Sequence, residues 1–127
     1  MADTPHEWQW LESTRALQRD AFGLDPDRDV RDVAAQAIRV KDNVLAAIVE
    51  LVEMLNEVKW KYWSHEEPWV RRGRVLKEAV DVNHFVANAL VAVGVTDEEY
   101  KEAYQAKQAE NRQRQIDKYV SAQAKER

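Results

Sequence analysis

Apolar residues recur every three or four positions between residues 30 and 55, and this period most strongly constrains the fold. They are Val30, Val33, Ala37, Val40, Val44, Ile48, Leu51 and Leu55. Such spacing places side chains on one face of an α-helix, whereas a half-buried strand would alternate apolar and polar residues. We therefore expect one long helix that follows the loop at 25–27 and ends near Trp63.

The ends of a first helix are marked by capping residues. Thr4-Pro5-His6-Glu7 reads as a capping box, with Thr4 as the N-cap and Pro5 at the first helical position. Gly23 follows Phe22 and can adopt the left-handed conformation that often stops a helix. The sequence therefore predicts a helix from residue 4 to residue 22.

Two more helices are predicted beyond the long one. Ser64-His65-Glu66-Glu67-Pro68 resembles another capping signal, so a third helix is expected to begin there and to end at Gly94. Thr96 starts a fourth helix, which is polar and carries few apolar anchors. Four helices with short connections predict an all-α four-helix bundle.

Composition bounds the function. The chain has 127 residues, 45% of them hydrophobic and 33% charged, which suits a single domain over 1–127, with 119–127 expected to form a fraying tail. It has no cysteine, so a metal must be held by oxygen or histidine ligands. The net charge of -4 and the lack of a long apolar run argue against nucleic acid and membrane partners and for a cytoplasmic protein. We expect a homodimer, because the polar last helix leaves the unit short of a core of its own.

Two acidic couplets are the candidate metal ligands. Glu50 and Glu53 lie three apart in the long helix, as do Glu78 and Asp81 in the third helix. Each couplet can direct two carboxylates toward one point, and hard oxygen ligands of this kind suit Mg²⁺, with Mn²⁺ as the alternative. A helical wheel favours the opposite interpretation for Glu50 and Glu53, because it places them across the helix from the apolar stripe, on a solvated face.

The fourth helix adds a polar stripe at helical spacing: Tyr104, Lys107, Asn111 and Arg114. A lysine point charge and a forked guanidinium both suit phosphate oxygens held opposite a metal. The alternative is an ordinary charged surface helix. The aromatic run Trp60, Tyr62 and Trp63 is similarly open, since it fits a core, an interface or stacking on a nucleobase.

These motifs together resemble a known family. ELVEMLNEVKWKYWS, then EAVDVNHF, then AYQAKQAENRQRQIDKY resemble, in order, the motifs of the dimeric all-α dUTPases within the MazG-type nucleoside triphosphate pyrophosphohydrolase superfamily. The resemblance covers roughly residues 16–119. It implies Mg²⁺-dependent hydrolysis of dUTP, and of dUDP as a second substrate, to dUMP with release of pyrophosphate or phosphate.

The resemblance also implies roles for individual residues. The metal ligands would be Glu50, Glu53, Glu78 and Asp81. The nucleotide would be bound by Gln18, Trp63, His84, Phe85, Lys107, Asn111, Arg114 and Tyr119. Glu53 is our candidate for the residue that activates the attacking water, with Glu50 as its competitor.

Two other functions stay open at this point. A relative that hydrolyses dCTP or a purine dNTP would share the acidic couplets without needing the base-binding residues. A non-catalytic helical dimerisation or regulatory module would retain the acids and show no dependence on Mg²⁺. Both are separated from a dUTPase by testing each dNTP for hydrolysis with and without Mg²⁺.

Overall fold

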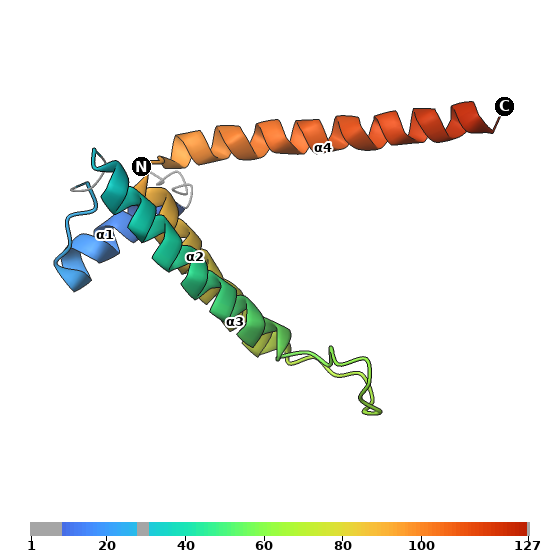
Figure 1. Cartoon of the computed structure of the whole chain (residues 1–127), viewed down its shortest axis with the longest axis horizontal. Coiled ribbons are helices and arrows are strands. Elements are labelled where there is room, and N and C mark those ends of the chain that lie inside the picture. The colour runs from blue at the N-terminus through green and yellow to red at the C-terminus, as the bar shows by residue number, and fades with distance from the viewer. Residues whose placement is uncertain (1–8, 28–30, 127) are drawn as a thin grey trace, which may run out of the picture. The chain divides into compact units, whose positions relative to one another are not determined.

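The computed structural model describes residues 9–27 and 31–126 and is all-α. Its helices are α1 (Trp10–Phe22), α2 (Val33–Leu55), α3 (Arg72–Ala92) and α4 (Asp97–Lys125) (Figure 1). The chain divides into two units, one ending at Val95 and the other beginning at Thr96, and each is described by itself. The predicted all-α class with four helices is confirmed.

Helix α1 packs against α3 and supplies the small apolar core. Leu11 is fully buried against Ala87 and Val91, and Trp10 packs on the same cluster. Gly23 ends the helix with φ +63°, as predicted. The capping box at 4–7 lies outside the described residues. Within them the helix begins at Trp10, after a non-helical Gln9, so the predicted start at Thr4 is not the start of the described helix.

Helices α2 and α3 lie side by side along most of their length (Figure 1). Between Asn43 and Met54, the less exposed residues of α2 are Asn43, Ala46, Ala47, Glu50 and Met54. Their spacing of three or four forms one face, which is small and polar. The apolar stripe of α2 points elsewhere, since Ile48 is 50% and Leu51 45% exposed. The wheel's assignment is therefore wrong for Glu50, which lies toward α3, and right for Glu53, which is exposed. Most of the apolar stripe lies at the surface.

A hairpin-like loop replaces the predicted ends of the second and third helices. Helix α2 ends at Leu55 rather than near Trp63, and α3 begins at Arg72 rather than at 64–68. Val58 and Val70 form an isolated antiparallel bridge, and the Lys59 amide donates to the Trp69 carbonyl at 2.9 Å. The alternation of Val58, Trp60 and Tyr62 with lysines is a strand period. Pro68 also disfavours a helical conformation in the residue before it.

Helix α4 begins as predicted. The Thr96 hydroxyl accepts a hydrogen bond from the Glu99 amide at 3.2 Å, and the first turn carries three acids that suit the positive end of the helix. The helix continues through Lys125 and has no buried residue. Among the described residues, no single helix is long and apolar enough to cross a membrane, and only α3 and α4 taken together meet that test.

Candidate active site

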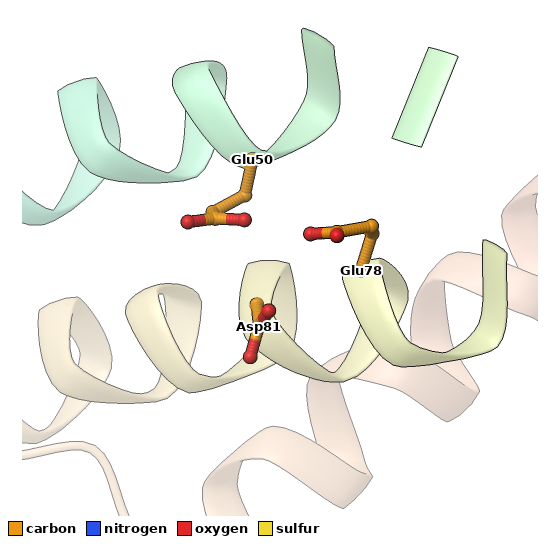
Figure 2. A group of neighbouring side chains, drawn as sticks. All are labelled: Glu50, Glu78 and Asp81. Atoms are coloured by element: carbon orange, nitrogen blue, oxygen red, sulfur yellow. The ribbon is translucent and has the colours of Figure 1, made fainter. Parts of the chain in front are cut away.

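Three of the four predicted carboxylates converge between α2 and α3. One oxygen from each of Glu50, Glu78 and Asp81 lies within 4.8 Å of the other two. Figure 2 shows Glu50 reaching from α2 and Glu78 from α3, with their carboxylates pointing toward one another and Asp81 beside them. We call these three residues the acidic group. The convergence follows from the small residues of the α2 face, which let the two helices approach.

Two oxygens of the acidic group are buried without a donor. Among the described residues, Glu50 Oε2 and Glu78 Oε2 have no hydrogen-bond partner. A buried carboxylate oxygen without a donor or a cation is costly. The Glu78 carboxyl group, followed by burial and the charges of Glu53 and Asp81, raises the pKa of Glu50 from 4.5 to about 7. The acidic group therefore holds a proton near neutral pH unless a cation takes its place.

Glu53 lies next to the acidic group and outside it. The charge of Glu53 contributes to the raised pKa of Glu50, so the two carboxylates are neighbours on α2. Glu53 is exposed, in contrast to the partly buried Glu50, Glu78 and Asp81. One of the four predicted ligands thus stays open to solvent.

The donor set fits a hard divalent cation. The acidic group offers only carboxylate oxygens, and its two buried oxygens lack any other positive partner among the described residues. Mg²⁺ and Mn²⁺ both take oxygen ligands from a few carboxylates, with water and phosphate oxygens completing the shell. A cation at this point would satisfy both orphan oxygens and offset the mutual repulsion of the acids.

A pocket of about 440 Å³ lies beside the acidic group, and we call it the amide pocket. It is lined by Thr14, Leu17, Gln18, Phe22, Leu24, Arg39, Asn43, His84, Phe85 and Asn88. Phe85 follows Asp81 by four residues, which is about 6 Å along α3. The structure therefore brings three predicted base-binding residues together: Gln18, His84 and Phe85.

Trp63 lies elsewhere. It is 57% exposed in the hairpin-like loop, where it contacts Trp60 edge-on with ring centroids 5.7 Å apart. It lines a second pocket, also of about 440 Å³, together with Asn56, Val58, Lys59, Trp60, Lys61, Ser64, Glu66 and Trp69. Trp63 and Phe85 therefore line different pockets.

The predicted phosphate-binding residues are exposed on α4. Lys107 Nζ lies 3.4 Å from Glu110 Oε2, and Arg114 Nη2 lies 3.2 Å from Glu110 Oε1. The Tyr119 hydroxyl accepts a hydrogen bond from Gln123 at 2.7 Å. Asn111 lies on the same helix and is also exposed. Glu110 thus forms ion pairs with both Lys107 and Arg114.

Two asparagines of the amide pocket were missed by the sequence analysis. Asn88 accepts a hydrogen bond from Gln18 and donates one to Asn43, which joins three helices through their side chains. Their spacing from the acidic couplets could have indicated them in the sequence. Asn43 precedes Glu50 by seven residues, and Asn88 follows Asp81 by seven. Seven residues are nearly two helical turns, so each asparagine shares a face with its acid.

Comparison with known proteins gives a family for this arrangement. The family model described as dUTPase matches residues 23–92, which is more than half of the chain and includes all four acids, His84 and Phe85. No curated protein and no solved structure gives a match. Gln18 and α4 lie outside the matched range. The chain belongs to the all-α dUTPase family and is an enzyme that acts as a dUTP diphosphatase.

Proposed function

We propose that this dUTPase requires Mg²⁺, or Mn²⁺ in its place, bound by the acidic group, and that it converts dUTP to dUMP and pyrophosphate. It also converts dUDP to dUMP and phosphate. The observation that carries the proposal is the pair of buried oxygens, Glu50 Oε2 and Glu78 Oε2, which lack any donor among the described residues. When bound, the cation supplies charge that neutralises phosphate oxygens as the anhydride breaks.

The amide pocket is the proposed site for the base. Phe85 offers an aromatic ring, and Gln18 and His84 offer polar groups in the same cavity. The pocket adjoins the acidic group along α3, so a nucleotide with its base in the pocket would carry its phosphates toward Glu78 and Asp81. Trp63 lies in the second pocket, and its proposed role against the base would require a change of the loop or a second protomer.

Glu53 is the proposed general base. It is the one acid of the four that is exposed and outside the acidic group, so its carboxylate is available to a water molecule. The water oxygen bonds to phosphorus, its proton passes to Glu53, and the α–β anhydride bond of dUTP breaks to release pyrophosphate. Glu50 is the competitor for this role, because its raised pKa makes its carboxylate a stronger base than an ordinary glutamate.

Replacing Glu53 with Gln tests this assignment. We expect the Glu53→Gln variant to lose at least about 100-fold in kcat, because an amide cannot accept the proton. The measurement is pyrophosphate release from dUTP at saturating Mg²⁺, with circular dichroism to show that helicity is retained. Glu67→Gln, an exposed acid of the loop, is the matched control. Turnover in Glu53→Gln equal to that of the control would transfer the role to Glu50.

Helix α4 is proposed to contact the nucleotide through Lys107, Asn111, Arg114 and Tyr119. Supporting this, its cations and amide recur at helical spacing, and the helix has no buried residue of its own. Lys107 and Arg114 would then exchange Glu110 for phosphate oxygens, which bind cations more strongly because they carry more charge.

A homodimer is proposed through the exposed apolar face of α2. Val44, Leu45, Ile48, Leu51, Val52 and Leu55 are each at least 42% exposed. A contiguous apolar face on a helix surface is typical of an interface. The proposed partner is a second copy of this chain, because the same stripe on two protomers can pair about a two-fold axis.

A screen of nucleotides tests the proposed reaction as a whole. Each dNTP and dUDP is incubated with the protein, with Mg²⁺ and with a chelator, and the products are identified. We expect dUTP to be the preferred substrate and the chelator to abolish turnover. Preference for dCTP or a purine dNTP would contradict the proposed base site, and hydrolysis that is unaffected by the chelator would contradict the proposed metal.

A further inference from the structure

Three side-chain amides form a chain of hydrogen bonds across α1, α3 and α2. Gln18 Nε2 donates to Asn88 Oδ1 at 3.1 Å. Asn88 Nδ2 donates to Asn43 Oδ1 at 3.2 Å. Asn43 Nδ2 donates to the main-chain carbonyl of Arg39 at 2.8 Å. We call Gln18, Asn88 and Asn43 the amide chain.

The last bond sets the direction of the whole amide chain. An amide side chain has a donor end and an acceptor end, and by itself either end can face a neighbour. The Arg39 carbonyl can only accept, so Asn43 must present its NH₂ group there and its oxygen to Asn88. Asn88 must then present its own NH₂ group to Asn43 and its oxygen to Gln18. Each orientation follows from the one before it.

The amide chain leaves an acceptor at its free end. With Gln18 Nε2 directed at Asn88, Gln18 Oε1 is turned away from that bond. Gln18 is only 8% exposed and lines the amide pocket, and among the described residues its Oε1 atom is buried without a partner. A buried acceptor of this kind calls for a donor from a ligand.

We infer that Asn43 and Asn88 are positioning residues that hold the Gln18 amide with its oxygen toward the base, so that the pocket selects a ring N–H. This inference rests on the proposed function, in which the base occupies the amide pocket. Uracil carries hydrogen on its N3 nitrogen and can donate to Gln18 Oε1. Cytosine has a bare N3 nitrogen, which would meet the same oxygen as a second acceptor. The amide chain thereby favours uracil over cytosine.

Asn43→Ala is the principal test, because Asn43 is linked to Gln18 only through Asn88. Without Asn43, Asn88 and Gln18 can both turn, and the Gln18 NH₂ group can face cytosine. We expect the ratio of kcat/KM for dUTP to that for dCTP to fall by roughly tenfold or more, the effect of one mispaired buried hydrogen bond. Asn83→Ala, exposed on α3 and outside the pocket lining, is the matched control and should leave the ratio unchanged.

A second variant separates orientation from general damage. Asn88→Ala should lower the ratio by itself, and Asn43→Ala added to it should lower the ratio no further, because Asn43 acts through Asn88. An equal loss of kcat/KM for dUTP and dCTP in Asn43→Ala would overturn the inference, since that is the result of a merely structural role.

Binding of dUMP and dCMP, measured by calorimetry, is independent of hydrolysis. We expect the wild-type protein to bind dUMP more tightly than dCMP, and Asn43→Ala to reduce that difference. If the wild-type protein prefers dUMP while no nucleotide is hydrolysed, the proposed reaction fails and the inference stands. Equal affinities of the wild-type protein for dUMP and dCMP would overturn the inference, even with dUTP hydrolysis intact.

Discussion

The carboxylate of Glu50 lies among three other acids, and this crowding governs its protonation. The Glu78 carboxyl group has the largest effect, followed by burial and by Glu53 and Asp81, and together they raise the pKa of Glu50 to about 7. A proton and a divalent cation are alternative ways to relieve the same repulsion. Metal binding at the acidic group should therefore release protons near neutral pH.

A pH dependence of stability follows for the metal-free protein. In the folded state Glu50 keeps its proton up to a pH of about 7, whereas in the unfolded chain it loses the proton near 4.5. The folded state therefore binds more protons in this window, and the free energy of unfolding should fall as pH rises through it. Urea denaturation at pH 5 and pH 8, in the presence of a chelator, measures the change.

The Glu50→Gln variant is the comparison for this prediction. It has no proton to lose, so its free energy of unfolding should fall less between the two pH values than that of the wild-type protein. An equal or larger fall in Glu50→Gln would contradict the raised pKa. Adding Mg²⁺ to the wild-type protein should stabilise it more at pH 8 than at pH 5, because the cation competes with the proton.

Residue identity and spacing predicted much of the site. The acidic couplets indicated Glu50, Glu78 and Asp81, which the structure brings together. The resemblance implied Gln18, His84 and Phe85, which share the amide pocket. The partnership of Asn43 with Asn88 could not be predicted, because a bond between residues 45 positions apart depends on how α2 and α3 are rotated about their axes.

At the scale of single elements, helix ends were predictable where the stop or start is a local interaction. Gly23 and Thr96 end and begin their helices through their own backbone or side chain. The loop between α2 and α3 was not predicted, because its acids and serine imitate a cap. Ser64 instead closes a turn by accepting from the Glu66 amide at 3.3 Å, and the aromatic side chains hold the loop.

Glu110 should weaken nucleotide binding by α4. It pairs with Lys107 and Arg114, and in the proposed complex the phosphates must displace it from both. Exposed pairs of this kind are worth little, so the Glu110→Gln variant should lower KM for dUTP by about two- to fivefold and leave kcat nearly unchanged. Steady-state kinetics measure both quantities.

Glu102→Gln is the control for that variant, because Glu102 is also exposed on α4. It should leave KM unchanged. A higher KM in Glu110→Gln would mean that Glu110 assists binding rather than opposes it, and an unchanged KM would mean that Lys107 and Arg114 do not reach the phosphates.

At the scale of the whole molecule, the assignment of faces on α2 is the main difference between sequence and structure. The sequence shows which residues of a helix share a stripe, but the stripe that faces a neighbouring helix depends on the tertiary packing. Here Glu50 and the small residues of α2 face α3, whereas Ile48 and Leu51 are half exposed. The acidic group at this helix contact needs a cation or a proton to offset the repulsion between its carboxylates.

The apolar stripe leads to a prediction about assembly. Ile48→Lys places a charge in the centre of the exposed face, so it should weaken the proposed dimer by at least roughly tenfold. Light scattering coupled to size exclusion at micromolar concentration measures the mass. Ala21→Lys adds the same charge at an exposed position of α1 and should remain dimeric. A wild-type protein that is monomeric at this concentration would contradict the proposal.

The central claim is that Glu50, Glu78 and Asp81 hold the cation on which dUTP hydrolysis depends. Its most direct test is a Mg²⁺ titration of dUMP formation by the wild-type protein and by Glu78→Gln. We expect no turnover by the wild-type protein without a divalent cation, a saturable rise as Mg²⁺ is added, and at least a roughly tenfold higher Mg²⁺ requirement in Glu78→Gln. Full activity of the wild-type protein in a chelator, or the same Mg²⁺ requirement in both proteins, would contradict the claim.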